Sequence, residues 1–171
     1  MNFEDHIRDI PDFPKPGVIF KDITPLLATP EAFKEVIDVM AERVKDLEFD
    51  TIIVPEARGF LFGSALAYKL GKKLVPVRKP GKLPYDVVEV SYTLEYGEAR
   101  IQMHKDALSK GEKVLIVDDV LATGGTIKAI EKLANKLEAE VSGVLCLIEL
   151  SFLNPREKFD NNIRVESILT Y

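Results

Sequence analysis

The sequence predicts an α/β fold in which a doubly wound, mostly parallel sheet is flanked by helices. Short apolar runs of strand length alternate along the chain with stretches whose apolar residues recur at helical spacing. Glycines and prolines separate these stretches, and such alternation is typical of parallel strands joined by crossover helices. Because 171 residues, 46% of them hydrophobic, provide one well-buried core, we expect a single domain over residues 1–171.

The first unit of this alternation is a helix, a strand and a second helix. A helix is predicted from Thr29, the expected N-cap, to Leu47, because its apolar residues form a stripe and a proline occupies the first helical position. Residues 51–54 are predicted as a short buried strand. Residues 60–70 are predicted as a helix that ends at the glycine following it.

The same unit recurs further along the chain. Residues 74–77 and 114–117 are predicted strands, and a glycine-rich turn leads from the second of them into an amphipathic helix at residues 127–137. Strands are also predicted at residues 141–147 and 163–169. The strands should therefore lie side by side in one sheet.

One segment breaks this rhythm. Residues 87–103 are rich in β-branched and aromatic residues around a central Glu-Tyr-Gly sequence, which predicts a hairpin inserted between two crossover units. A hairpin that projects from a sheet is a candidate lid. We expect this lid over about residues 84–104.

Composition excludes several classes of partner. The net charge of −5 provides no overall field that would attract nucleic acid or an anionic membrane. No stretch approaches the roughly 18 apolar residues of a membrane span, and residues 1–14 lack the pattern of a signal peptide. The single cysteine, Cys146, excludes an internal disulfide framework and suits a reducing compartment. We expect a cytoplasmic protein without nucleic-acid or membrane partners.

The most informative segment follows the predicted strand at residues 114–117. Asp118 and Asp119 come directly after it, and a turn rich in glycine and threonine then opens a helix. Backbone N–H groups in such a turn, together with the helix dipole, favour a terminal phosphate, whereas the acids suit sugar hydroxyls or a nearby cation. The alternative for the acids is an ordinary polar loop with a helix cap. The predicted phosphate-binding residues are Ala122, Thr123, Gly124, Gly125 and Thr126.

Positive charge is concentrated in one window. Residues 58–85 hold seven cations and no acid. The lysines near the end of the predicted helix suit a solvated face. The other cations follow the strands ending at Val54 and Val77, on the sheet edge where a polyanionic leaving group would need neutralising. These candidate anion-binding residues are Arg58, Arg78, Lys79 and Lys82.

Several motifs in a fixed order resemble those of type I phosphoribosyltransferases, and most closely the adenine phosphoribosyltransferase family. The similarity extends from near residue 8 to about residue 150, and we assign no chemistry to residues 152–171. It implies transfer of a phosphoribosyl group from phosphoribosyl pyrophosphate to adenine, which yields AMP and pyrophosphate in purine salvage. It also implies Mg²⁺ bound mainly through the substrate, no protein metal site, and a homodimer. The motifs lie at residues 8–14, 20–25, 58–60, 77–84, 91–97 and 114–126.

The resemblance also implies roles for single residues at the base. Phe20 would stack on adenine within a base-binding segment of about residues 1–28, although Phe20 alone would also suit a core position. Backbone groups of Ile19 and Lys21 would bind the edge of the base, and Leu150 would close the pocket.

In the predicted lid, the resemblance gives Glu95 a proton-transfer role and Tyr96 a packing or positioning role. A carboxylate desolvated by lid closure can exchange protons near neutral pH. His104 is the competing titratable group, near the pyrophosphate in the same or the neighbouring subunit. Arg58 and Lys79 would stabilise the departing pyrophosphate, whereas Ala57 stands where some family members have a small polar residue.

Two other functions remain open from the sequence. A related transferase acting on hypoxanthine, guanine or xanthine would share the phosphosugar loop and differ in the base pocket. A regulatory module of the same fold would bind phosphoribosyl pyrophosphate without turnover, although the chain shows no basic nucleic-acid-binding segment.

Overall fold

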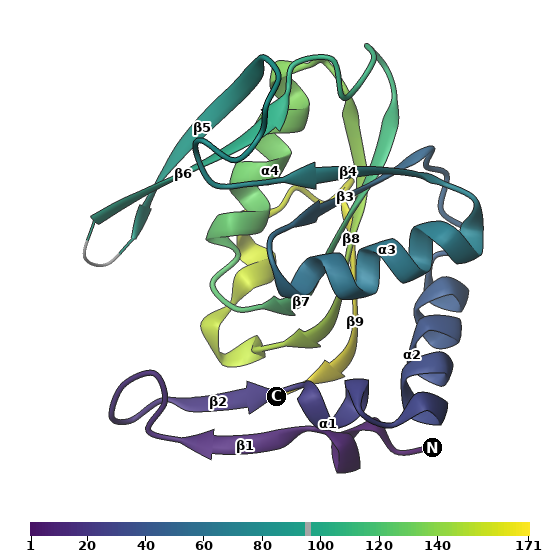
Figure 1. Ribbon diagram of the computed structural model, residues 1–171, viewed down its shortest axis with the longest axis vertical. Helices are drawn as coiled ribbons and strands as arrows, with labels where there is room; N and C mark the ends of the chain where they lie inside the picture. The colour runs from purple at the N-terminus through teal and green to yellow at the C-terminus, as the bar shows by residue number, and fades with distance from the viewer. Residues whose placement is uncertain (95–96) are drawn as a thin grey trace.

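A five-stranded parallel sheet forms the centre of the computed structural model, which describes all residues except 95 and 96. Its strand order is β4-β3-β7-β8-β9 (Figure 1), and every neighbouring pair is parallel. The predicted α/β fold class is confirmed, and the final predicted strand lies at one edge, beside β8. The strands are β3 (Thr51–Pro55), β4 (Lys73–Val77), β7 (Lys113–Leu121), β8 (Glu140–Glu149) and β9 (Arg164–Thr170).

The helices begin close to the predicted positions. The first long helix, α2, begins at Pro30 but ends at Arg43, although its apolar stripe continues to Leu47. The hydroxyl of Thr29 donates to the carbonyl of Pro25 (3.0 Å), so this residue does not cap the helix through its side chain. Among the described residues, no helix is both long and apolar enough to cross a membrane. The helices are α1 (Thr24–Leu27), α2 (Pro30–Arg43), α3 (Arg58–Leu70) and α4 (Gly125–Lys136), with 3-10 turns η1 (Phe3–His6), η2 (Ser151–Leu153) and η3 (Pro155–Lys158).

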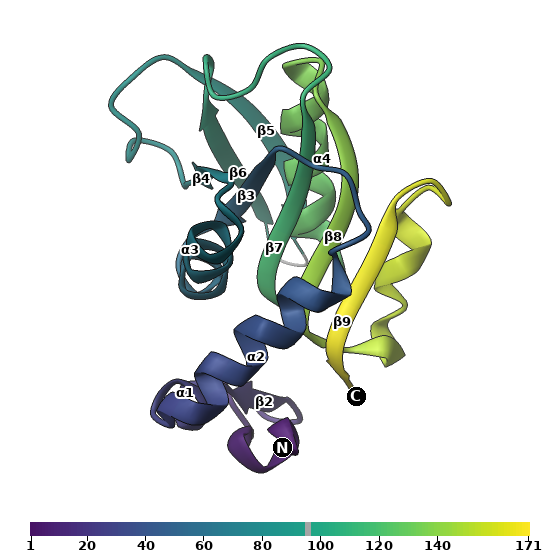
Figure 2. The same ribbon diagram turned by 90° about the vertical axis from the view of Figure 1, so that its right-hand side faces the viewer.

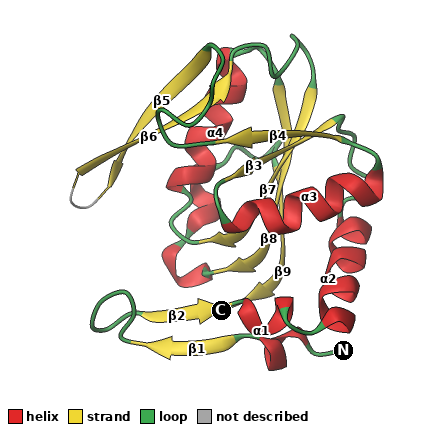
Figure 3. Ribbon diagram, viewed as in Figure 1, coloured by secondary structure: helices red, strands yellow, loops and turns green. Residues whose placement is uncertain are grey.

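The sheet separates two apolar cores because side chains alternate between its faces. On β7, Ile116 packs into the core beneath α4, whereas Leu115 packs into the core beneath α2 and α3. Figure 3 shows the helices distributed around the central strands. The sheet is therefore covered on both faces, as the alternation of strands and helices predicts.

The prediction that the strand beginning at Val114 ends at residue 117 was wrong. Strand β7 continues to Leu121, so Asp118 and Asp119 lie within the strand and Asp118 pairs with Cys146 of β8. The apolar run ends at residue 117, but backbone pairing with the long neighbour β8 continues, because a ladder depends on backbone groups.

Two antiparallel hairpins lie outside the central sheet. The N-terminal one consists of β1 (Arg8–Pro11) and β2 (Ile19–Asp22), and Figure 2 shows it grouped with α1 beyond one end of α2. The other consists of β5 (Val87–Leu94) and β6 (Gly97–His104), which confirms the predicted inserted hairpin. A bridge between Arg78 and Gln102 connects β6 to the end of β4.

Candidate active site at the carboxyl edge of the sheet

A cavity of about 460 Å³ opens where the parallel strands end. Segments distant in sequence meet there because the carboxyl ends of parallel strands share one edge of a sheet. Most of the predicted base-binding and sugar-binding residues line it. The lining residues are Val18, Ile19, Phe20, Lys21, Pro55, Glu56, Ala57, Arg58, Asp118, Asp119, Val120, Ala122, Thr126 and Leu150.

Phe20 and its apolar neighbours Val18, Ile19 and Leu150 line the part of the cavity that is called the base slot below. The rings of Phe13 and Phe20 meet edge to face with centroids 5.2 Å apart, and the Arg58 guanidinium carbon lies 5.4 Å from the Phe20 ring centroid. The Lys21 ammonium instead pairs with Asp9 (2.7 Å) and lies 4.0 Å from the centroid of the Tyr171 ring. Lys21 also lines the cavity, and the Phe20 ring provides an aromatic surface there on which a flat ligand could stack.

The acidic pair, Asp118 and Asp119, also lines the cavity. Asp119 is 4% exposed and accepts a hydrogen bond from Arg58 Nε at 2.5 Å. The Asp119 backbone N–H donates to Asp118 Oδ1 (2.8 Å). Burial and the neighbouring Asp119 charge raise the pKa of Asp118. A Cβ on Gly59 would lie 2.9 Å from Asp118 Oδ1, so a glycine in the first turn of α3 allows this close approach.

The predicted phosphate loop lines an adjoining hollow of about 80 Å³. Gly124 adopts a left-handed conformation (φ 88°) as the N-cap of α4, and no side chain caps the helix. The Gly125 N–H donates to Thr123 Oγ1 (3.3 Å), and the Tyr92 hydroxyl lies 3.2 Å from Thr126 Oγ1. The lid hairpin therefore contacts the loop that would hold a phosphate.

Two of the predicted leaving-group cations, Arg78 and Lys82, pair through their side chains with an acid that the sequence analysis missed. Glu56, 12% exposed at its side chain, accepts from Arg78 Nε (3.3 Å), the Lys79 backbone N–H (2.8 Å) and Lys82 Nζ (2.6 Å). Burial alone would raise the pKa of Glu56, but these donors outweigh it and the pKa is lowered. Glu56 lines the cavity, so these cations contact a residue of the cavity wall. Its position directly after β3 was the signal that could have identified it.

Comparisons with known proteins show the family of this chain. A family model described as a phosphoribosyl transferase domain matches residues 22–165. An adenine phosphoribosyltransferase of Pseudothermotoga lettingae is 57% identical over 171 residues, which are 100% of each chain. The chain belongs to the adenine phosphoribosyltransferase family.

Solved structures of this family superpose closely on the chain. The adenine phosphoribosyltransferase of Thermoanaerobacter pseudethanolicus gives a TM-score of 0.96 at 49% identity, covering 99% of this chain and 98% of that one. The Saccharomyces cerevisiae enzyme gives 0.88 at 36% identity over 95% of each chain, and its structure is a complex with an imino-altritol bisphosphate and adenine. The family and enzyme class predicted from the sequence are confirmed.

Four of the predicted residues that the structure describes, Arg78, Lys79, Lys82 and His104, line neither the cavity nor the adjoining hollow. Glu95 and Tyr96 lie outside the described residues. His104 lines a separate cavity of about 270 Å³ with Lys73 and Asp106, and its Nε2 accepts from the Tyr85 backbone N–H (3.4 Å). Within this chain, His104 therefore does not line the base slot.

The cavity acids fit a metal carried by a substrate better than a protein-held metal. Among the described residues, no group of three or more His, Cys, Asp or Glu side chains is arranged to hold a metal ion. Asp119 is already paired with Arg58, and the raised pKa of Asp118 disfavours its charged form. A Mg²⁺ ion in this cavity would therefore depend on ligand oxygens.

Proposed function

We propose that this cavity is where the chain transfers the 5-phosphoribosyl group from phosphoribosyl pyrophosphate to adenine, forming AMP and pyrophosphate in purine salvage. The observation that carries the proposal is the meeting, at one sheet edge, of an aromatic slot, an acidic pair and a phosphate-sized hollow. These match the base, the ribose and the 5′-phosphate of one nucleotide. The adenine in the yeast relative's structure supports adenine over other purines.

The base and the sugar have separate partners in this arrangement. Adenine stacks on Phe20 in the segment of residues 1–28, with backbone groups of Ile19 and Lys21 at its edge and Leu150 closing the slot. Asp118 and Asp119 accept hydrogen bonds from the ribose hydroxyls. The 5′-phosphate occupies the hollow lined by Ala122, Thr123, Gly124, Gly125 and Thr126.

The reaction replaces one bond at the anomeric carbon with another. The bond from this carbon to the pyrophosphate oxygen breaks, a bond to the adenine ring nitrogen forms, and that nitrogen loses its proton. We assign the proton to Glu95 on the lid, with Tyr96 positioning the lid. Closure of the lid excludes water that would otherwise hydrolyse the sugar.

Cations stabilise the departing pyrophosphate. Arg58 lines the cavity directly, and the Arg78 and Lys82 side chains reach the leaving group when it competes for their contacts with Glu56. The Lys79 backbone N–H contacts Glu56, and we assign the Lys79 ammonium to the same leaving group. A Mg²⁺ ion held by the substrate oxygens would supply further positive charge when bound. His104 would contribute near the pyrophosphate from a neighbouring subunit.

We also propose that the chain forms a homodimer in the cytoplasm. On α3, Leu61 and Tyr68 are 42% and 92% exposed, and their spacing places them on one face of the helix. Burying such an apolar face is a common reason for association. The free, buried Cys146 is in keeping with a reducing compartment. Size-exclusion chromatography with light scattering tests the dimer, because a monomeric mass would contradict it.

The kinetics of Phe20→Ala test the assignment of the base slot. We expect the KM for adenine to rise at least about tenfold, on the scale of one lost base–aromatic stack, while the KM for phosphoribosyl pyrophosphate changes less than about twofold. Val18→Ala, at the same cavity wall, is the matched control. Equal increases in both KM values for Phe20→Ala would refute the stacking role.

A further inference from the structure

The C-terminal turn, to which the sequence analysis assigned no chemistry, lies against the phosphate loop. A Cβ on Gly124 would lie 3.3 Å from the Pro155 carbonyl oxygen and 3.3 Å from Lys158 Cδ, both in η3. Lys158 Nζ donates a hydrogen bond to the Thr123 carbonyl oxygen. The turn η3, which is distant in sequence, therefore packs against the phosphate loop.

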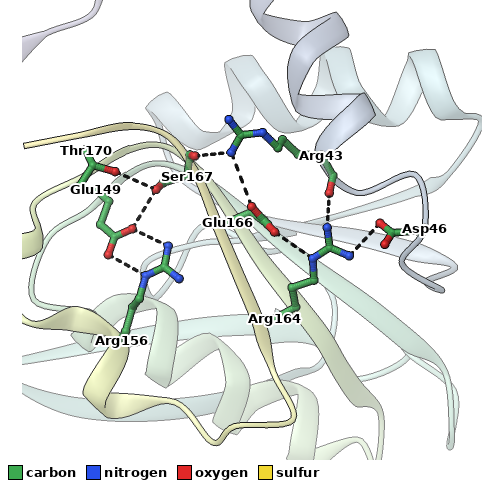
Figure 4. A network of polar contacts seen from close by, with 8 residues as sticks. All are labelled: Arg43, Asp46, Glu149, Arg156, Arg164, Glu166, Ser167 and Thr170. Carbon is green, nitrogen blue, oxygen red and sulfur yellow. Dashed lines mark hydrogen bonds and ion pairs between the residues drawn. The ribbon is translucent and has the colours of Figure 1, made fainter.

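The turn is itself held firmly in place. Glu149, at the end of β8 and 4% exposed, accepts two hydrogen bonds from Arg156, from Nε at 2.9 Å and from Nη2 at 2.8 Å. Ser167 of β9 donates a third at 2.8 Å, and Arg43 of α2 donates to the Ser167 carbonyl at 2.9 Å. Figure 4 shows this network joining α2, β9 and the turn. These hydrogen bonds therefore hold in place the turn that carries Lys158.

The hydrogen bond from Lys158 to the Thr123 carbonyl fixes the direction of the next backbone N–H, that of Gly124. The cis peptide bonds of the described residues lie elsewhere, so the Thr123–Gly124 peptide is trans, and its C=O and N–H point in opposite directions. When Lys158 holds the Thr123 carbonyl, the Gly124 N–H points away from the turn. Gly124 also lines the phosphate-sized hollow.

We propose that Lys158 is a positioning residue for the substrate's 5′-phosphate. By holding the Thr123 carbonyl, it presents the Gly124 N–H to the phosphate, and its charge strengthens the anion-binding field of the loop. This inference rests on the proposed function, because it concerns the phosphate subsite of that reaction. It gives the C-terminal turn a role in binding phosphoribosyl pyrophosphate.

The test compares Lys158→Met, which keeps the aliphatic stem, with Lys158→Arg, which keeps a charged donor. Lys110→Met is the matched control, since Lys110 is 81% exposed and pairs with Glu138 away from the cavity. For Lys158→Met we expect the KM for phosphoribosyl pyrophosphate to rise about five- to tenfold, the scale of one hydrogen bond. The KM for adenine should change less than about twofold, and Lys158→Arg should restore most of the loss.

Calorimetric binding of ribose 5-phosphate separates this inference from the proposed function. Lys158→Met should weaken that binding by the same factor even if the wild-type protein forms no AMP. Failure of the wild-type protein to form AMP would overturn the proposed function alone. Unchanged affinity in Lys158→Met, an equal loss in Lys110→Met, or no binding to the wild-type protein would overturn the role of Lys158.

Discussion

Replacing Arg58 with Gln should destabilise the fold through the acid that Arg58 neutralises. The Asp119 side chain is 6% exposed and that of Arg58 is 52% exposed, with 2.5 Å between Nε and Oδ2. Removing the guanidinium leaves two adjacent acids in the cavity lining without their cation. An unpaired buried charge costs more than the intact pair contributes.

The size and pH dependence of the loss follow from this geometry. Breaking a fully buried pair costs about 3–5 kcal/mol, but water screens the half-exposed Arg58, so we expect a loss of about 2 kcal/mol in the free energy of unfolding at pH 8. For a chain of this length that corresponds to about 4–8 °C in Tm. The raised pKa of Asp118 means that the folded state takes up a proton more readily than the unfolded state. This contribution favours folding at low pH and is lost as pH rises. Because Arg58 lowers the Asp118 pKa, its removal costs most where the acids are ionised, so the loss should shrink to about 1 kcal/mol at pH 5.

Urea unfolding of four proteins measures this effect: wild type, Arg58→Gln, Asp119→Asn and the double variant, each at pH 5 and pH 8. The double variant should recover most of the stability lost in Arg58→Gln, because it no longer contains the unpaired Asp119 carboxylate. A loss of equal size at both pH values, or a double variant no more stable than Arg58→Gln, would refute the reasoning.

Three further predictions concern the lid, the leaving group and the core. Glu95→Gln should lower kcat by roughly 10²-fold or more, and near-normal single-turnover rates would remove Glu95 from the mechanism. Lys79→Ala should raise the KM for phosphoribosyl pyrophosphate far more than the KM for adenine in initial-rate measurements, whereas equal effects would contradict its assignment. Gly63→Ala would place a Cβ 1.9 Å from Val54 Cγ1, so overpacking should cost at least about 1–3 kcal/mol. An unchanged urea midpoint would show that α3 moves away from β3 without cost.

Local patterns in the sequence predicted most of the fold. The apolar runs containing Ile53 and Ile116 are buried on both sides of the sheet, and such runs are typical of central parallel strands. Gly71 ends α3 in a left-handed conformation (φ 65°), as its position after the apolar stripe predicts. The predicted parallel strands also indicated the sheet edge at which the site lies, because ligands bind beyond the carboxyl ends of such strands.

Contacts between residues distant in sequence were beyond prediction from local patterns. Glu56 has no acidic neighbour in the sequence. Its role as an ion-pair partner depends on the loop after β4, which brings Lys82 Nζ to 2.6 Å from Glu56 Oε2. The contact of Tyr92 with Thr126 and that of Lys158 with Thr123 likewise depend on how the hairpin and the C-terminal turn fold back. The continuation of β7 to Leu121 depended on its pairing with β8.

Initial rates with a panel of purines test the central claim most directly. Purified protein with labelled phosphoribosyl pyrophosphate would be assayed with adenine, hypoxanthine, guanine and xanthine, with and without Mg²⁺. We expect Mg²⁺-dependent formation of AMP and pyrophosphate, with kcat/KM for adenine at least about 10²-fold above that for the other bases, because a site that hydrogen-bonds the edge of adenine rejects bases with another donor and acceptor pattern. Saturable binding of phosphoribosyl pyrophosphate without AMP, or faster turnover of another purine, would contradict it.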